Sequence, residues 1–111
     1  MQTVILAVLS ILLSVAAQFA LKAGARACAG CAAWAMALQP MVLFGLCLYG
    51  LSAVVWLSVL AKWDVSKAYP MVGFGFAISV GVGAALGEPV TAARWAGVAL
   101  ICAGVLLIGR T

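Results

Sequence analysis

Polar side chains recur at every fourth position along the first apolar stretch of the chain, at Ser10, Ser14, Gln18 and Lys22. Residues four apart share a helix face, so a helix would carry these side chains as one polar stripe. Their hydroxyl and amide groups could bond a neighbouring helix or could line a polar path for a charged headgroup. Both interpretations stay open for Gln18. For the two serines we favour bonding between helices, with Ser14 kept as a candidate substrate contact.

A second group of candidates combines two cations with two aromatic side chains, namely Lys62, Lys67, Trp56 and Tyr69. Both lysines flank apolar stretches, where an ammonium group either extends to the membrane surface or pairs with a lipid phosphate. Trp56 lies well inside an apolar stretch, so it packs between helices or stacks on a ligand. Cation and ring chemistry of this kind suits an anionic lipid headgroup.

The scarcity of ionisable side chains excludes most enzyme classes. The chain has no His and only two carboxylates, Asp64 and Glu88. General acid and base catalysis and imidazole ligation of a metal therefore have almost no groups to use. We expect no enzymatic activity, no metal and no cofactor. Glu88, beside Gly87 and Pro89, is interpreted as part of a turn or helix cap.

The four cysteines do not form a recognisable metal site. Cys28 and Cys31 make a CxxC pair without a second pair or a His, and Cys47 and Cys102 lie within apolar stretches. We therefore expect unpaired cysteines, with a disulfide or a transient metal contact as the alternatives for the CxxC pair.

The composition places the chain in a membrane. Of 111 residues, 68% are hydrophobic and 7% are charged, and the mean hydropathy is +1.32. A water-soluble domain of this size could not cover its surface with eight charged side chains. The net charge of +4 comes from single basic residues between apolar stretches, which would meet lipid phosphates instead of nucleic acid.

Spanning the hydrocarbon layer takes ~20 apolar residues in a helix. Charge-free stretches of that length predict an all-α membrane protein that is one domain over residues 1–111, with helices over residues 3–21, 40–61, 65–86 and 91–108. The first stretch differs from a signal peptide because its positive charges follow the apolar run and no cleavage site is evident. The connection over residues 23–39 is either an interfacial helix or an extension of the second helix.

The positions of the Lys and Arg residues do not predict which side of the membrane each loop faces. One side of the membrane would hold Lys62, Lys67 and Arg110, and the other would hold Lys22, Arg26 and Arg94. Each side would hold three basic residues, so the positive-inside rule favours neither orientation.

Small residues mark the third and fourth predicted helices. Two stripes run along the third, one at Gly73, Ala77, Gly81 and Ala85 and one at Gly75, Ser79, Gly83 and Gly87. They allow a second helix to approach or leave a groove for a lipid chain. Pro70 removes one backbone donor near the start of this helix and predicts a kink there. For the fourth helix we predict a dimer interface at Gly97, Leu100, Ile101, Gly104 and Val105.

Several of these motifs together resemble the small multidrug resistance superfamily. They are the run from Gly97 to Val105 with its Leu-Ile pair, the segments Leu13 to Gln18 and Ala68 to Met71, and the segment Glu88 to Val90 with Trp95. Within the superfamily, the resemblance is to subunits of the 4-amino-4-deoxy-L-arabinose-phosphoundecaprenol flippase. It covers most of the chain except residues 23–39.

The resemblance implies four transmembrane helices that function as a dimer. Where the drug exporters of the superfamily have a membrane-embedded Glu, this chain aligns Ser14. Without an acid at bilayer depth, neither proton exchange nor pairing with a cationic drug has an obvious group. A lipid-linked sugar phosphate instead needs cations at the interface and a groove open to lipid.

The sequence thus predicts a multi-pass transporter of the bacterial inner membrane. It would flip an undecaprenyl-phosphate-linked sugar of the aminoarabinose type for lipopolysaccharide modification. Lys67 and Lys62 would hold the phosphate, while Gln18 and Tyr69 would contact the sugar. The partner would be an identical chain or a related four-helix subunit. The alternatives are a small-molecule exporter and a structural or assembly subunit that transports nothing.

Overall fold

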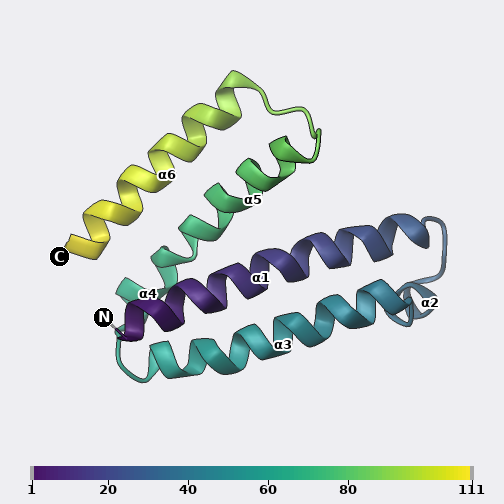
Figure 1. Ribbon diagram of the computed structural model, residues 1–111, viewed down its shortest axis with the longest axis horizontal. Helices are drawn as coiled ribbons and strands as arrows, with labels where there is room; N and C mark the ends of the chain where they lie inside the picture. The colour runs from purple at the N-terminus through teal and green to yellow at the C-terminus, as the bar shows by residue number, and fades with distance from the viewer. Residues whose placement is uncertain (1, 111) are drawn as a thin grey trace. The chain divides into compact units, whose positions relative to one another are not determined.

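A computed structural model describes residues 2–110, and every regular element in that range is a helix. Four helices are long and apolar enough to cross a membrane, which makes this an all-α, multi-pass membrane protein. The chain divides into two compact units, residues 1–58 and 59–111. Each unit contains a pair of helices that run in opposite directions (Figure 1).

The first unit pairs α1 (Gln2–Ala27) with all but the last two residues of α3 (Pro40–Leu60), and the short α2 (Ala33–Ala37) lies in the connection between them. Small residues bring the two long helices together. A methyl group on Gly45 would lie 2.9 Å from Leu21 Cγ and 3.1 Å from the carbonyl oxygen of Ala17. Closer to the connection between the helices, a methyl group on Gly24 would overlap the side chain of Val42. Glycine is therefore needed at both positions for this spacing.

The end of α1 differs from the expectation that the first helix stops at residue 21. The helix continues past Lys22 and Arg26 and ends at Ala27. Charges mark where the apolar stretch ends, but they do not stop a helix, because long basic side chains can reach the membrane surface from its last turn. A turn over residues 28–30 follows the helix, and Gly30 in it adopts a φ of +86°, a left-handed conformation that favours glycine.

The connection over residues 23–39 divides into an extension of the first helix, a tight turn and α2. Gln39 then caps α3, because its side-chain Oε1 accepts hydrogen bonds from the backbone N–H groups of Met41 at 2.7 Å and Val42 at 3.2 Å. Amide oxygens at this position satisfy donors that have no partner within the helix.

The second unit contains α4 (Val65–Met71), α5 (Gly73–Ala85) and α6 (Ala92–Arg110). The first two together form one candidate span over Val65–Ala85. They are separated at Val72, where the N–H of Val72 bonds the carbonyl of Tyr69 at 3.0 Å and the N–H of Gly75 bonds that of Val72 at 2.8 Å. These three-residue hydrogen bonds follow Pro70, which has no N–H to donate to Ser66.

A defined turn joins α5 to α6. The N–H of Glu88 bonds the carbonyl of Gly83 at 2.9 Å, and the N–H of Gly87 bonds that of Ala84 at 3.1 Å. With Gly87 at a φ of +92°, this is a Schellman motif. Glu88 thus belongs to the end of α5, while the hydroxyl of Thr91 caps α6 by accepting from the N–H of Arg94 at 3.2 Å.

Candidate functional site

The polar stripe of α1 separates into residues with different surroundings. Ser10 is buried and bonds α3, which confirms the interpretation of this serine as a link between helices. The hydroxyl of Ser14 donates to the carbonyl of Ile11 in its own helix at 2.7 Å. Gln18 is exposed on the surface of the first unit. Of the three, only Gln18 presents its polar group to the surroundings of the helix pair.

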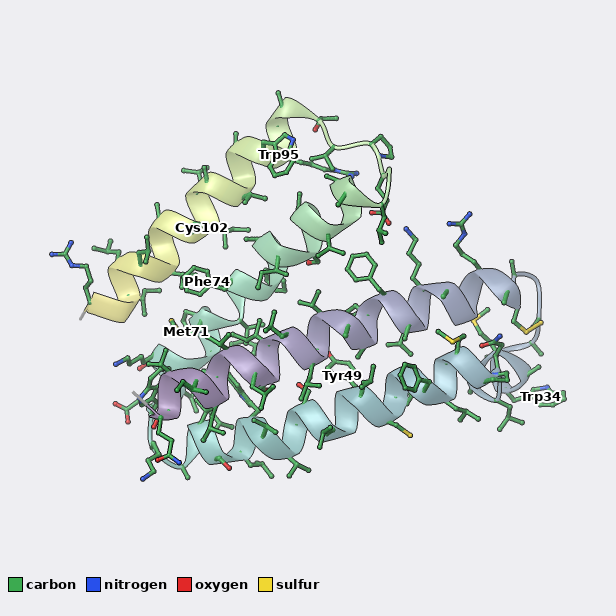
Figure 2. The ribbon with its side chains drawn as sticks, in the orientation of Figure 1. Trp34, Tyr49, Met71, Phe74, Trp95 and Cys102 are labelled. Carbon is green, nitrogen blue, oxygen red and sulfur yellow. A yellow bond between two sulfur atoms is a disulfide. The ribbon has the colours of Figure 1, made fainter. Side chains whose placement is uncertain are left out.

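The partner of Ser10 is Ser52 of α3, which is also buried. Each serine bonds the main chain of the other, since Ser10 Oγ lies 2.8 Å from the carbonyl oxygen of Ser52 and Ser52 Oγ lies 3.0 Å from that of Ser10. Trp56 is half-buried and Tyr49 is 45% exposed. Figure 2 labels Tyr49 on α3.

The cations of the second unit lie near the start of α4. Lys67 Nζ lies 4.7 Å from the centre of the Trp63 ring, which is a cation–π contact. Trp63 lies four residues before Lys67 but precedes the first residue of α4, so helical spacing did not indicate this contact in the sequence. Lys62 is exposed beside Trp63. Two ammonium groups and an indole therefore fall within six residues at one end of this unit.

An apolar groove of about 430 Å³ lies in the second unit, between α4 and α5 on one side and α6 on the other. Tyr69 and Pro70 line it together with Phe76, Ile101 and Val105. Tyr69 is 69% exposed, so its ring stands at an open part of the groove. Tyr69, which lines the groove, follows Lys67 by two residues in the sequence.

The predicted dimer interface does not form a single exposed surface. Ile101 and Val105 face α5, because a methyl group on Gly73 would lie 3.0 Å from Ile101 Cγ2 and 2.9 Å from Val105 Cγ2. In contrast, Leu100 is 75% exposed, and methyl groups on Gly97 or Gly104 would meet nothing within 4 Å. Ile101 and Val105 thus pack within the chain, whereas Gly97, Leu100 and Gly104 remain accessible to a second chain.

The expectation that Cys28 and Cys31 are unpaired is wrong, because the structure joins them in a disulfide. The turn at Gly30 places their Cα atoms 5.4 Å apart, which lies within the range for such bonds. Cys47 and Cys102 are free thiols. Among residues 2–110, no group of three or more His, Cys, Asp or Glu side chains could hold a metal ion.

The candidate residues thus form two sets within a multi-pass, all-helical membrane protein. Ser14, Gln18 and Trp56 belong to the first unit, and Lys62, Lys67 and Tyr69 belong to the second. The fold and these residues define the class as multi-pass, all-helical membrane proteins, here with two lysines and an apolar groove in the second unit.

Comparison with known proteins shows that the chain is similar in sequence to named membrane proteins. The chain is 47% identical over 62 residues to a protein of Pseudomonas savastanoi pv. phaseolicola named "Probable 4-amino-4-deoxy-L-arabinose-phosphoundecaprenol flippase subunit ArnE". The match covers 55% of this chain and 54% of that protein. Proteins with the same name from Pseudomonas syringae pv. syringae and Escherichia fergusonii are 42% and 38% identical, over 55% and 60% of this chain and 57% and 61% of their own lengths.

These matches confirm the resemblance to ArnE flippase subunits over part of the sequence. The chain spans about half the length of the curated relatives it matches. No family model matches the chain. No solved structure matches it either.

Proposed function

We propose that this chain is a subunit of a flippase that moves an undecaprenyl-phosphate-linked aminoarabinose-type sugar across the bacterial inner membrane. The observation that carries the proposal is the 38–47% identity to proteins named as subunits of such a flippase. Their names describe a transporter and not an enzyme. Because they are named as subunits, the functional assembly is proposed to contain a second four-helix chain, either identical or related.

The phosphate of the substrate is assigned to the start of α4. Lys67 is held over Trp63, and Lys62 is exposed five residues earlier. An ammonium group at the membrane interface attracts a lipid phosphate without the cost of a cation at bilayer depth. The contact with the ring already restricts the Lys67 side chain, so binding a phosphate costs less conformational entropy.

The apolar groove beside Tyr69 is assigned to the part of the prenyl chain next to the phosphate. Its lining is almost entirely carbon, and its volume of about 430 Å³ accommodates only a portion of a long prenyl chain. The remainder would stay in the bilayer. Tyr69 and Gln18 are proposed as sugar contacts, because both present polar groups on exposed surfaces of their units. Ser14 and Trp56 remain secondary candidates.

The proposal is tested in bacteria that lack the gene for this chain. Mass spectrometry would measure the aminoarabinose on lipid A in cells that carry an empty vector, the wild-type gene or Lys67→Gln. We expect the wild-type gene to restore the modification and Lys67→Gln to lower it by at least about tenfold, the effect of losing one charged hydrogen bond. Lys22→Gln on α1 is the control for a general loss of positive charge.

Two other outcomes would replace the proposal. Full modification with Lys67→Gln, at normal protein level, would favour an assembly subunit whose lysine contacts no substrate. Unchanged lipid A together with increased resistance to quaternary ammonium compounds would favour a small-molecule exporter.

A further inference from the structure

The disulfide stands at the tip of the helix pair in the first unit. The N–H of Cys31 bonds the carbonyl of Cys28 at 3.0 Å across a tight turn. The two ends of the connection are fixed to each other, because Gly24 packs against Val42 and the side chain of Gln39. The turn is therefore a fixed part of the hairpin, and it holds the two sulfur atoms together.

This turn lies beyond the hydrocarbon layer. Helix α1 contains 26 residues, which at ~1.5 Å each exceeds the ~30 Å thickness of the layer. Lys22 and Arg26 occupy its last turns, before the cysteines. Trp34, in the next helix, is 72% exposed and points away from α1 and α3 (Figure 2). An exposed tryptophan and basic residues that follow an apolar helix are both typical of the membrane–water interface.

The two cysteines are open to reaction at this interface. Cys31 is exposed and Cys28 is half-buried, whereas Cys47 and Cys102 lie within the membrane-spanning helices. Disulfides form and persist in the bacterial periplasm, while the cytoplasm keeps thiols reduced. An oxidised CxxC pair at a membrane surface thus identifies the side of the membrane that the surface faces.

We propose that Cys28 and Cys31 are oxidised in the periplasm and that this pair therefore reports the orientation of the chain. The connection between α1 and α3 faces the periplasm, and with α3 crossing the membrane, the turn that contains Lys62 and Asp64 faces the cytoplasm. The count of basic residues, three on each side, is compatible with this orientation.

The oxidation requires a protein disulfide of the thiol-oxidase class. One thiolate of the pair attacks that disulfide and forms a mixed disulfide, and one thiolate of the oxidant leaves. The second cysteine then attacks the mixed disulfide, forms the Cys28–Cys31 bond and releases the second thiolate. This chain loses two electrons and two protons, and the oxidant becomes a dithiol.

The inference rests on the inner-membrane location in the proposed function and does not depend on which lipid is moved. In combination with the proposed phosphate contact, it places Lys62 and Lys67 at the cytoplasmic leaflet.

The redox state is tested in the full chain carrying Cys47→Ser and Cys102→Ser, expressed in bacteria and quenched with acid. Free thiols are blocked with N-ethylmaleimide, and the protein is then reduced and treated with a maleimide–polyethylene glycol mass tag. We expect two tags, one for each cysteine of the disulfide. The same chain with an added Cys28→Ser is the control and should gain none. Absence of tags on the chain that retains both cysteines would overturn the proposal.

The orientation is tested with single cysteines and a membrane-impermeant maleimide on spheroplasts. A chain with Cys31 as its only cysteine should react in intact spheroplasts, and a cysteine-free chain carrying Lys62→Cys should react only after the membrane is broken. Asp64→Cys reports on the same turn if Lys62→Cys does not accumulate. The reversed pattern, or equal labelling at both positions, would overturn the orientation. Restored lipid A modification by the wild-type chain in that case would leave the flippase proposal intact, so the two failures are distinguishable.

Discussion

Ser10 of α1 and Ser52 of α3 bond each other's main chain through both side chains. The two bonds span 2.8 Å and 3.0 Å, and the two hydroxyl oxygens lie 3.2 Å apart. Both residues are buried, so water is not available as an alternative partner. The reciprocal pair fixes the register of α1 against α3 as well as stabilising the contact, because a shift of either helix would break both bonds.

Ser10→Ala and Ser52→Ala should each destabilise the chain by about 0.6–1.7 kcal/mol, the range for hydrogen bonds between membrane helices. The double variant should cost less than the sum of the two, because either substitution alone already removes shared contacts. Reversible unfolding in mixed micelles measures these values. Ser14→Ala is the control, since its hydroxyl bonds only its own helix. Strict additivity of the two substitutions would contradict the pairing.

Gly24→Ala should weaken the helix pair because the added methyl group would overlap Val42 and lie 2.8 Å from Gln39 Oε1. We expect a loss of about 1–3 kcal/mol, as for overpacking elsewhere. Gly50→Ala is the matched control, because nothing lies within 4 Å of its added methyl group. That change should be neutral or stabilise α3 by up to about 1 kcal/mol. The same unfolding assay compares them, and equal effects would show that Gly24 is not at a close contact.

Pro70→Ala should allow α4 and α5 to join. An alanine N–H can bond the carbonyl of Ser66, which favours a continuous helix through Val72. Spin labels at Ser66→Cys and Ala77→Cys in a chain otherwise free of cysteine would report the distance across the break. We expect the mean distance to change and its distribution to narrow with Pro70→Ala. An unchanged distribution would mean that packing, and not the proline, maintains the break.

Trp63→Leu should weaken substrate handling without removing the cation. Loss of the ring releases Lys67 from a contact worth about 0.5–1 kcal/mol, or roughly a two- to fivefold effect. The aminoarabinose content of lipid A should therefore fall less than with Lys67→Gln. Trp34→Leu, at an exposed tryptophan outside the second unit, should have no effect. A larger loss with Trp63→Leu than with Lys67→Gln would mean that the ring itself contacts the substrate.

The spans of the fold could be predicted from the sequence because hydropathy alone determines them. All four expected spans correspond to helices of the structure, since a bilayer requires long apolar helices. The end of α1 and the break at Val72 depend instead on local backbone chemistry. A turn with a positive φ at Gly30 follows the end of α1, three-residue hydrogen bonds after Pro70 mark the break, and apolar content indicates neither point.

The candidate site could be predicted only as a set of residue types. Spacing along α1 placed Ser10 and Ser14 on one face, but it could not show that Ser10 bonds Ser52 while Ser14 bonds its own helix. Likewise, a CxxC motif alone did not indicate whether the thiols pair. The answer depended on a turn that Gly30 makes possible. Trp63 was missed because it precedes the first residue of α4, although it lies four residues before Lys67.

Lipid movement in membrane vesicles tests the central claim most directly. Right-side-out inner-membrane vesicles would be loaded with the undecaprenyl-phosphate-linked aminosugar on their inner leaflet and exposed to an amine reagent that cannot cross the bilayer. With the wild-type chain, the amine should become accessible outside, and with Lys67→Gln this should slow by at least about tenfold. Equal rates with and without the chain, or accumulation of hydrophobic cations in place of lipid movement, would contradict the account.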